Sequence, residues 1–225
     1  MFDYDAAVRD AFPTIRAGVV RADGLVNQAS SHGLREAYRA EQNAARKRLN
    51  ATPIAEIPSI AAWRRAFAGF GAKPTQYRSA PEALLRRLDK HGDIPSISTL
   101  VDLGNLVSIR YALPVAVLDR AKVAGSITVR FATGAEHFEE LGSSETVHPE
   151  PGEVIFVDAD GVVSARRWCW RQSARTATGP DTTEALFVVE GHHDHAATDL
   201  TRATADLTML LAAHQPDAHV QVFML

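Results

Sequence analysis

The stretch that decides the fold is LVDLGNLVSIRYALPVAVLD, residues 100–119. Apolar residues recur in it at helical spacing as far as Tyr111, which predicts a helix with one apolar face. Pro114 lacks an amide proton and disfavours helical backbone at the residue before it, so the helix must end there. The short β-branched run VAVLD, residues 115–119, then predicts a buried strand. We therefore expect a helix that turns at Pro114 into a strand of the core.

Two polar residues of this helix, Asp102 and Asn105, are three positions apart and so lie on one face, near the apolar stripe. One interpretation is that both side chains bond to neighbouring backbone groups, because buried polar groups are usually hydrogen-bonded. The alternative is that Asn105 points into a pocket and orients a substrate. The spacing leaves both interpretations open.

Helical patterns dominate the first half of the chain and strand patterns the second. Before residue 100 we expect a short helix over 3–12, a strand over 14–25, and helices over 34–49, 58–70 and 79–90. After residue 119 we expect a strand over 126–132, a hairpin over 152–163 with an extension over 166–172, a strand over 184–192, a helix over 198–214 and a closing strand over 219–225. Few βαβ units are evident, which favours an α+β fold. We treat residues 1–225 as one domain, with residues 1–75 as an integral extension.

Composition excludes several classes of protein. The chain has 225 residues, 46% of them hydrophobic, which is typical of a globular protein with a sizeable core. A net charge of −3 argues against coating nucleic acid by bulk attraction, so any RNA contact would use a local basic face and give a shallow salt dependence. One cysteine, Cys169, excludes an internal disulfide framework. No run is long enough to cross a bilayer and the first ten residues are not signal-like, so we expect a cytoplasmic protein. We expect no cofactor.

The segment RRWCWRQSART, residues 166–176, is the richest in chemistry. In an extended chain Arg167, Cys169 and Arg171 would lie on one face, and Trp168, Trp170 and Gln172 on the other. Aromatic rings offer flat surfaces to a base or an amino acid, and arginines offer phosphate contacts. The alternative is an ordinary sheet with tryptophans in its core and arginines outside.

Histidines gather in GHHDH, residues 191–195, with Asp199 nearby. Imidazole and carboxylate groups are metal ligands, so this cluster is a candidate metal site. Ligands so close in sequence rarely converge, however, and nothing like HExxH is present. We expect instead an exposed loop, with Asp199 or Thr198 capping the next helix, and no metal site.

Three segments carry a family resemblance. VDLGNLVSIRYALPVAVLDRAKVAGSITVRFA (101–132), GEVIFVDADGV (152–162) and RRWCWRQSARTATGPDTT (166–183) resemble the tRNA-editing domain of the phenylalanyl-tRNA synthetase β chain. The tryptophan-bearing segment is more similar to free-standing relatives of that domain. The resemblance covers roughly residues 79–190 and implies a layered β/β/α sandwich. It includes no ATP-binding catalytic domain, so it does not imply synthetase activity.

The resemblance also implies a site. Asn105 matches an asparagine of the family, whereas Ala116 stands where the family has a histidine. In the segment where the family carries a glutamate that reads the amino-acid side chain, this chain has Arg171 and Gln172 and no acid, which implies a different amino acid as target. Hydrolysis of an aminoacyl ester can still proceed with a positioned water and the vicinal ribose hydroxyl, the protein supplying orientation and polarisation.

The resulting hypothesis assigns three groups of residues. The catalytic group, which holds the reacting ester and its water, is Asn105, Gln172 and Thr182. The substrate wall is Pro114, Ala116, Trp168, Trp170 and Arg171. Contacts to the RNA are assigned to Arg86, Arg87, Arg167 and Arg175.

The function that follows is that of an RNA-binding trans-editing factor. It would bind the acceptor end of a misacylated tRNA and hydrolyse the wrong aminoacyl ester. One rival is a module that binds tRNA or an amino acid without turnover. A second rival is a metal-dependent hydrolase that uses residues 192–195. Oligomeric state is left open.

Overall fold

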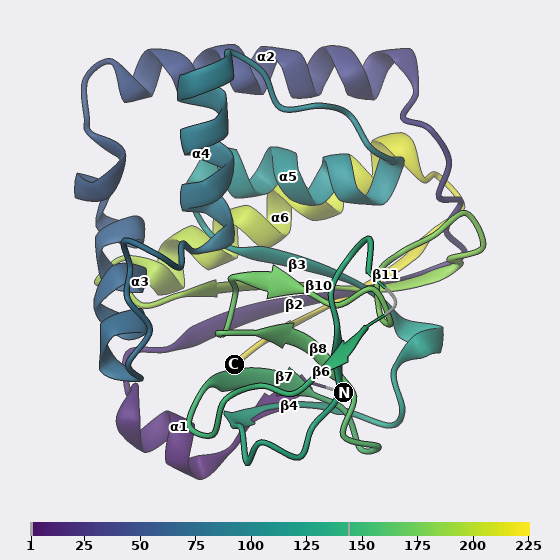
Figure 1. The fold of residues 1–225 in the computed structure, drawn as a ribbon. Helices are drawn as coiled ribbons and strands as arrows, with labels where there is room; N and C mark the ends of the chain where they lie inside the picture. Colours follow the sequence, from purple (N-terminus) through teal and green to yellow (C-terminus); the bar gives the residue numbers. More distant parts are fainter. Residues whose placement is uncertain (1, 144) are drawn as a thin grey trace.

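Two β-sheets packed face to face, with helices over one outer face, form three layers in the computed structural model, which describes residues 2–143 and 145–225 (Figure 1). One core fills the space between the sheets and includes Phe2, Val129, Phe156, Val19 and Val188. A second core lies between the other face of one sheet and the helices. The expected α+β fold, a β/β/α sandwich, is confirmed.

The first sheet has the order β1-β4-β7-β8-β9, in which only β1 and β4 are parallel. Its strands are β1 (Phe2–Tyr4), β4 (Ile127–Phe131), β7 (Val154–Val157), β8 (Val163–Arg166) and β9 (Arg171–Gln172). The second sheet is antiparallel throughout, with the order β11-β2-β10-β3. Its strands are β11 (His219–Met224), β2 (Arg16–Asp23), β10 (Glu184–Gly191) and β3 (Val115–Asp119). Two short strands, β5 (Phe138–Glu139) and β6 (Thr146–Val147), pair separately.

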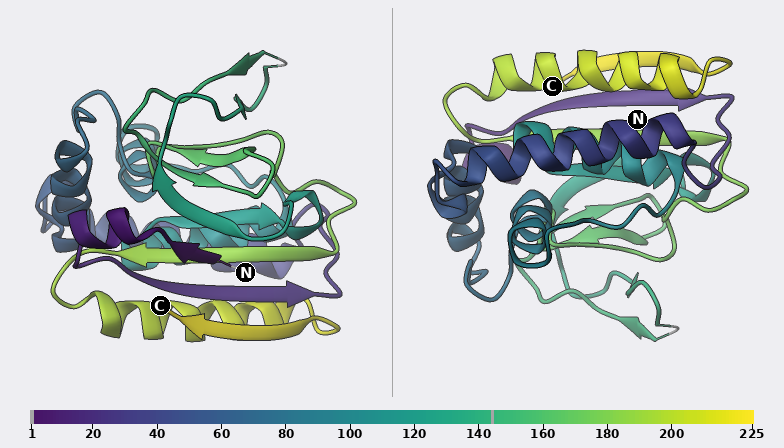
Figure 2. Two further views of the ribbon diagram at one scale, coloured as in Figure 1. Left: turned by 90° about the horizontal axis from the view of Figure 1, so that it is seen from below. Right: turned by 90° about the horizontal axis from the view of Figure 1, so that it is seen from above.

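Helices α5 (Thr99–Tyr111) and α6 (Ala196–His214) cover the second sheet, and α2 (His32–Leu49) packs over α5 (Figure 1). Figure 2 shows α4 (Ala80–His91) and α6 on opposite sides of α2. The remaining helices are α1 (Ala6–Ala11) and α3 (Pro58–Gly69), with 3₁₀ turns η1 (Ile54–Glu56) and η2 (Arg120–Lys122). No helix among the described residues has both the length and the apolar character that a membrane span requires.

The helix-to-strand turn at Pro114 forms as the sequence predicts. Ala112 ends α5 in the left-handed conformation, with φ of 52°. The Leu113 amide donates to the carbonyl of Ser108 at 3.2 Å, and the Ser108 hydroxyl donates to the Leu113 carbonyl at 2.7 Å. These bonds satisfy backbone groups that the end of the helix leaves open. They fix the direction in which β3 enters the sheet.

Asp102 is fully buried within the helical layer and has hydrogen-bond partners. Its carboxylate accepts from the Ser30 hydroxyl at 2.6 Å, from the Ser96 hydroxyl, and from the Ile97 amide at 2.9 Å. It thereby joins the segment before α2 to the segment before α5. Its role is structural.

Two segments differ from the sequence prediction. Residues 3–12 are not one helix, because residues 2–4 pair with β4 and Asp5 then caps α1 through the Ala7 amide at 2.9 Å. The run from Arg167 to Trp170 is a turn rather than a strand, and only Arg171 and Gln172 rejoin the sheet.

Gly104 allows α5 to approach β3, and we predict that alanine there lowers the free energy of unfolding. An added Cβ would lie 2.6 Å from Cγ2 of Val117 and 3.5 Å from Cγ1 of Val115. Overpacking costs about 1–3 kcal/mol, which exceeds the gain in helix propensity of about 1 kcal/mol. Gly33→Ala in α2, where an added Cβ meets nothing within 4 Å, is the matched control and should be neutral or stabilising. Urea denaturation of both variants measures this, and equal effects would contradict the packing account.

Candidate functional site

A small cavity opens between the start of β3 and the turn that joins β8 to β9. Its volume is about 70 Å³. The five residues expected to form a substrate wall all line it, namely Pro114, Ala116, Trp168, Trp170 and Arg171. Gln172 and Glu190 line it as well, together with Ala80, Val115, Phe156, Ala165 and Cys169. Segments far apart in the sequence therefore meet here.

The turn at Arg167 and Trp168 has unusual backbone geometry. Both residues have positive φ, 43° and 60°, a conformation that is rare for large side chains. The Trp168 amide donates to the Val154 carbonyl at 2.6 Å, and its side chain is fully buried. Strained backbone of this kind is often found at functional sites. It also removes the expected alternation of arginines and tryptophans on two faces.

Glu190 is the acid of the cavity, and its side chain is buried. Its Oε1 accepts from the Tyr4 hydroxyl at 2.5 Å and from Nε1 of Trp168 at 2.9 Å. Burial raises the pKa of Glu190 to about 7, against the lowering effect of these two hydrogen bonds. Its Oε2 makes no hydrogen bond to any described residue, so it can accept one from a ligand.

The sequence patterns did not predict that Glu190 lines the cavity. The matching segment around Arg171 does contain no acid, but Glu190 comes from β10, eighteen residues after Gln172. Strand pairing brings it to the cavity, because Val188 pairs with Ala116 and the Glu190 amide donates to the Pro114 carbonyl at 3.3 Å. A single carboxylate in the apolar run ALFVVEG, residues 185–191, was the available signal.

Arg171 and Gln172 serve different purposes. The Gln172 side-chain amide donates to the Val117 carbonyl at 2.6 Å, which ties β9 across to β3. Arg171 pairs with Glu140 at 2.9 Å, lies over the Trp170 ring at 5.0 Å, and has a side chain that is half exposed. The structure therefore places Arg171 at the mouth of the cavity, and the hydrogen bond of Gln172 supports the cavity wall.

Arg167, expected to contact RNA, is an internal residue instead. It pairs with Glu153 at 2.8 Å, and its side chain is 13% exposed. Its guanidinium lies 4.1 Å from the Tyr77 ring centroid and 5.0 Å from that of Trp170. Desolvation by burial lowers the pKa of Arg167. These contacts stabilise the strained turn.

Two expected catalytic residues lie outside the cavity. Asn105, in α5, is not among its lining residues. Thr182 is buried at the far end of β3, where its hydroxyl donates to Asp119 at 2.7 Å and accepts from the Gly179 amide at 2.8 Å. The structure does not bring either side chain to the substrate wall.

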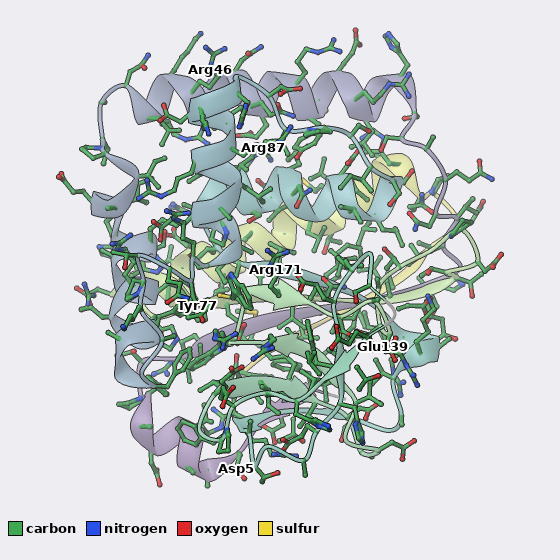
Figure 3. All side chains as sticks on the ribbon, in the orientation of Figure 1. Asp5, Arg46, Tyr77, Arg87, Glu139 and Arg171 are labelled. Atoms are coloured by element: carbon green, nitrogen blue, oxygen red, sulfur yellow. The ribbon has the colours of Figure 1, made fainter. Side chains whose placement is uncertain are left out.

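The other expected RNA contacts are on two different parts of the surface. Arg86 and Arg87 belong to α4, where they face Glu82 at 2.9 Å and Asp93 at 4.0 Å. Arg175 pairs with Glu139 of β5 at 3.0 Å. Figure 3 shows Arg87 and Glu139 well apart, with Arg171 between them in this view. They do not form one basic face with the cavity.

His192 and His193 are buried, whereas Asp194 and His195 are exposed, so the expectation of an exposed loop is wrong for the first half of the histidine segment. The His192 ring lies 4.5 Å from the Trp63 ring and 5.0 Å from the Trp168 ring, and burial lowers the pKa of His192 to about 3. His193 Nε2 lies 3.0 Å from Asp199. Within residues 2–143 and 145–225, no three His, Cys, Asp or Glu side chains are grouped to hold a metal ion. Helix α6 begins at Ala196 with no side-chain cap.

Fold and site together define the class: a β/β/α sandwich domain with an aromatic cavity that contains a buried acid. The chain belongs to the B3/4 domain family, whose model matches residues 62–208. It is 36% identical to the phenylalanine–tRNA ligase β subunit of Neisseria meningitidis serogroup B over 86 residues, and 35% identical to that of Bordetella pertussis over 91 residues.

These matches cover 38% and 40% of this chain but 11% of each relative, so the chain is similar to a small part of those proteins. A crystal structure of an N-terminal fragment of the phenylalanyl-tRNA synthetase β subunit from Pyrococcus horikoshii has the same fold. Its TM-score is 0.50 at 12% identity, over 98% of this chain and 50% of that one. The relationship to this domain family is thus confirmed.

Glu190→Gln should remove a pH dependence of stability. Because the pKa is about 7 in the folded protein and near 4.5 when unfolded, ionising Glu190 costs stability as pH rises between these values. The full cost is on the order of 3 kcal/mol above pH 7. We expect the variant to match the wild type near pH 4.5 and to exceed it near pH 8, measured by denaturant unfolding. Parallel stability profiles would contradict the assigned protonation.

Proposed function

We propose that this protein binds the acceptor end of an aminoacyl-tRNA in the cytoplasm and hydrolyses the ester of a wrongly attached amino acid. The observation that carries the proposal is the cavity itself, which Glu190 lines together with Trp168, Trp170 and Arg171, and in which Oε2 of Glu190 makes no hydrogen bond to a described residue. Membership of the B3/4 family and similarity to phenylalanine–tRNA ligase β subunits support the same substrate class.

Each wall of the cavity suits one part of such a substrate. The ammonium group of the amino acid, or a hydroxyl on its side chain, donates to Glu190 Oε2. The indole of Trp170 offers a flat surface to the terminal base. Arg171 at the mouth meets a phosphate. The small volume favours a small side chain, because about 70 Å³ holds only a few water molecules, which need roughly 10–15 Å³ each.

The reaction transfers the acyl group to water. Water adds to the ester carbonyl, the bond between that carbon and the ribose oxygen breaks, and the products are the free amino acid and deacylated tRNA. We assign Glu190 to holding the amino group, with the vicinal ribose hydroxyl and a positioned water doing the proton transfer. Asn105 and Thr182 have no part in this scheme, since neither lines the cavity.

The direct test is release of amino acid from a panel of misacylated tRNAs, with and without chelator. Release that resists the chelator supports the proposal. Tight retention of tRNA with no release would replace it with a non-catalytic binding module. Release abolished by chelator and restored by zinc would replace it with a metal-dependent hydrolase.

Arg171→Gln should lower kcat/KM for deacylation about tenfold, which corresponds to one charge-assisted contact of about 1.4 kcal/mol. Arg175→Gln is the matched control, because Arg171 and Arg175 are both about half exposed and pair with Glu140 and Glu139 at 2.9 and 3.0 Å. We expect the control to leave the rate unchanged. Equal losses in both variants would remove Arg171 from the site.

A further inference from the structure

Positive charge is concentrated in one part of the chain. Residues 32–92 contain twelve of the 24 Lys and Arg residues but five of the 27 Asp and Glu residues. This stretch, α2 to α4, therefore carries a net charge of +7, whereas the whole chain carries −3 and the remainder −10. The overall acidity conceals a strongly basic region.

Within this region α2 presents an exposed basic stripe. Arg35, Arg39, Asn43 and Arg46 recur at helical spacing on one face and are all exposed. None of these three arginines forms an ion pair with a residue in the described ranges. Of the two acids in α2, Glu36 lies 3.5 Å from His32, and Glu41 is buried against Arg48 and Arg110. The stripe is left without neutralising partners.

A groove of about 390 Å³ runs beside this stripe, between α2 and the loop that follows α4. Arg35, Arg39 and Asn43 line one wall, and Gly92 to Ser96 line the other. Asp93 is the acid of the groove, and it lies 4.0 Å from Arg87. Arg87 offsets the charge of Asp93, and Lys90 and Asp89 are both exposed at the end of α4, so the positive charge of the groove comes from Arg35 and Arg39. The groove is thus polar, cationic and open.

Helix α4 connects this groove to the candidate site. At its start, Ala80 lines the cavity and donates its amide to the Cys169 carbonyl at 2.9 Å. At its end, Gly92 lines the groove. Twelve helical residues span about 18 Å. Figure 3 shows Arg46, Arg87 and Arg171 in succession from α2, past α4, to the sheet.

We propose that this basic groove between α2 and the end of α4 binds the phosphate backbone of RNA, upstream of the aminoacylated end held in the cavity. The proposal rests on the proposed function for the identity of the RNA. The length of α4, about 18 Å between the cavity and the groove, corresponds to on the order of five stacked nucleotides at roughly 3.4 Å each. Helix α2 lies outside residues 62–208, so the wall of the groove that carries the basic stripe is not part of what the family model matches, whereas the wall formed by residues 92–96 is.

The side chains of the groove suit a polyanion that is bound through its backbone phosphates. Arginines on successive turns place guanidinium groups along a line, which suits evenly spaced phosphates. Such contacts do not depend on the RNA sequence. They weaken as the salt concentration rises, because the release of counterions from the RNA then favours binding less. The groove therefore adds affinity for the body of the RNA, and the cavity reads the attached amino acid.

The test compares uncharged tRNA binding by wild-type protein, Arg39→Gln and Arg39→Gln/Arg46→Gln over a salt series, using fluorescence anisotropy. Each lost phosphate contact should reduce the slope of log K against log salt by about one, so the double variant should lose about two. Arg202→Gln, an exposed arginine of α6 without an ion pair in the described ranges, removes the same charge elsewhere and should leave the slope unchanged.

A second readout separates this proposal from the function on which it rests. The double variant should hydrolyse an aminoacyl ester of adenosine as fast as the wild type, but show a raised KM for full-length aminoacyl-tRNA. An unchanged slope and KM, or equal changes in Arg202→Gln, would overturn the groove while leaving the deacylase intact. Loss of activity on the adenosine ester as well would place these arginines in the catalytic machinery and also overturn it. If the wild type hydrolyses no ester, the salt slopes still decide whether the groove binds RNA.

Discussion

The carboxylate of Glu190, shared by Tyr4 and Trp168, joins the parts of the molecule on which the candidate site depends. Glu190 belongs to β10 in one sheet, Tyr4 to β1 in the other, and Trp168 to the strained turn after β8. A buried carboxyl group is costly unless its hydrogen bonds are made. The two donors therefore hold the sheets in register at this point and fix the Trp168 indole. The second oxygen makes no hydrogen bond to a described residue, and Glu190 lines the cavity.

In this arrangement the residues that hold the cavity walls in place differ from those that could contact a ligand. Trp168, Arg167 and Gln172 are committed to internal contacts with Glu190, Glu153 and the Val117 carbonyl, and they hold the cavity walls in place. Preorganised groups of this kind can act on a substrate without reorganising during the reaction. Glu190 Oε2 makes no hydrogen bond to a described residue. The Trp170 ring already has the Arg167 and Arg171 guanidinium groups 5.0 Å from its centroid, and Arg171 pairs with Glu140, so a base or a phosphate would have to replace part of these contacts. The basic groove beside α2 would add affinity at a distance, so that a small cavity need not supply it.

Local signals in the sequence were sufficient for the α5–β3 turn, because Pro114 and the apolar periodicity act within a few residues. They failed at Arg167 and Trp168, whose left-handed backbone is imposed by contacts with Val154 and Glu190 from other strands. Glu190 escaped notice for the same reason, since strand order determines which carboxylate reaches the cavity. Asn105 does not line the cavity, and spacing alone could not show this, because α5 is covered by both α2 and the sheet and the spacing does not say which side a polar residue faces.

The most direct measurement is a crystal structure of the protein with a non-hydrolysable aminoacyl-adenosine, in which an amide replaces the ester. The account predicts that the aminoacyl group lies in the cavity with its amino group or side-chain hydroxyl on Glu190 Oε2, and the adenine against Trp170. An analogue bound elsewhere, with the cavity beside Trp168 and Glu190 left empty, would contradict it.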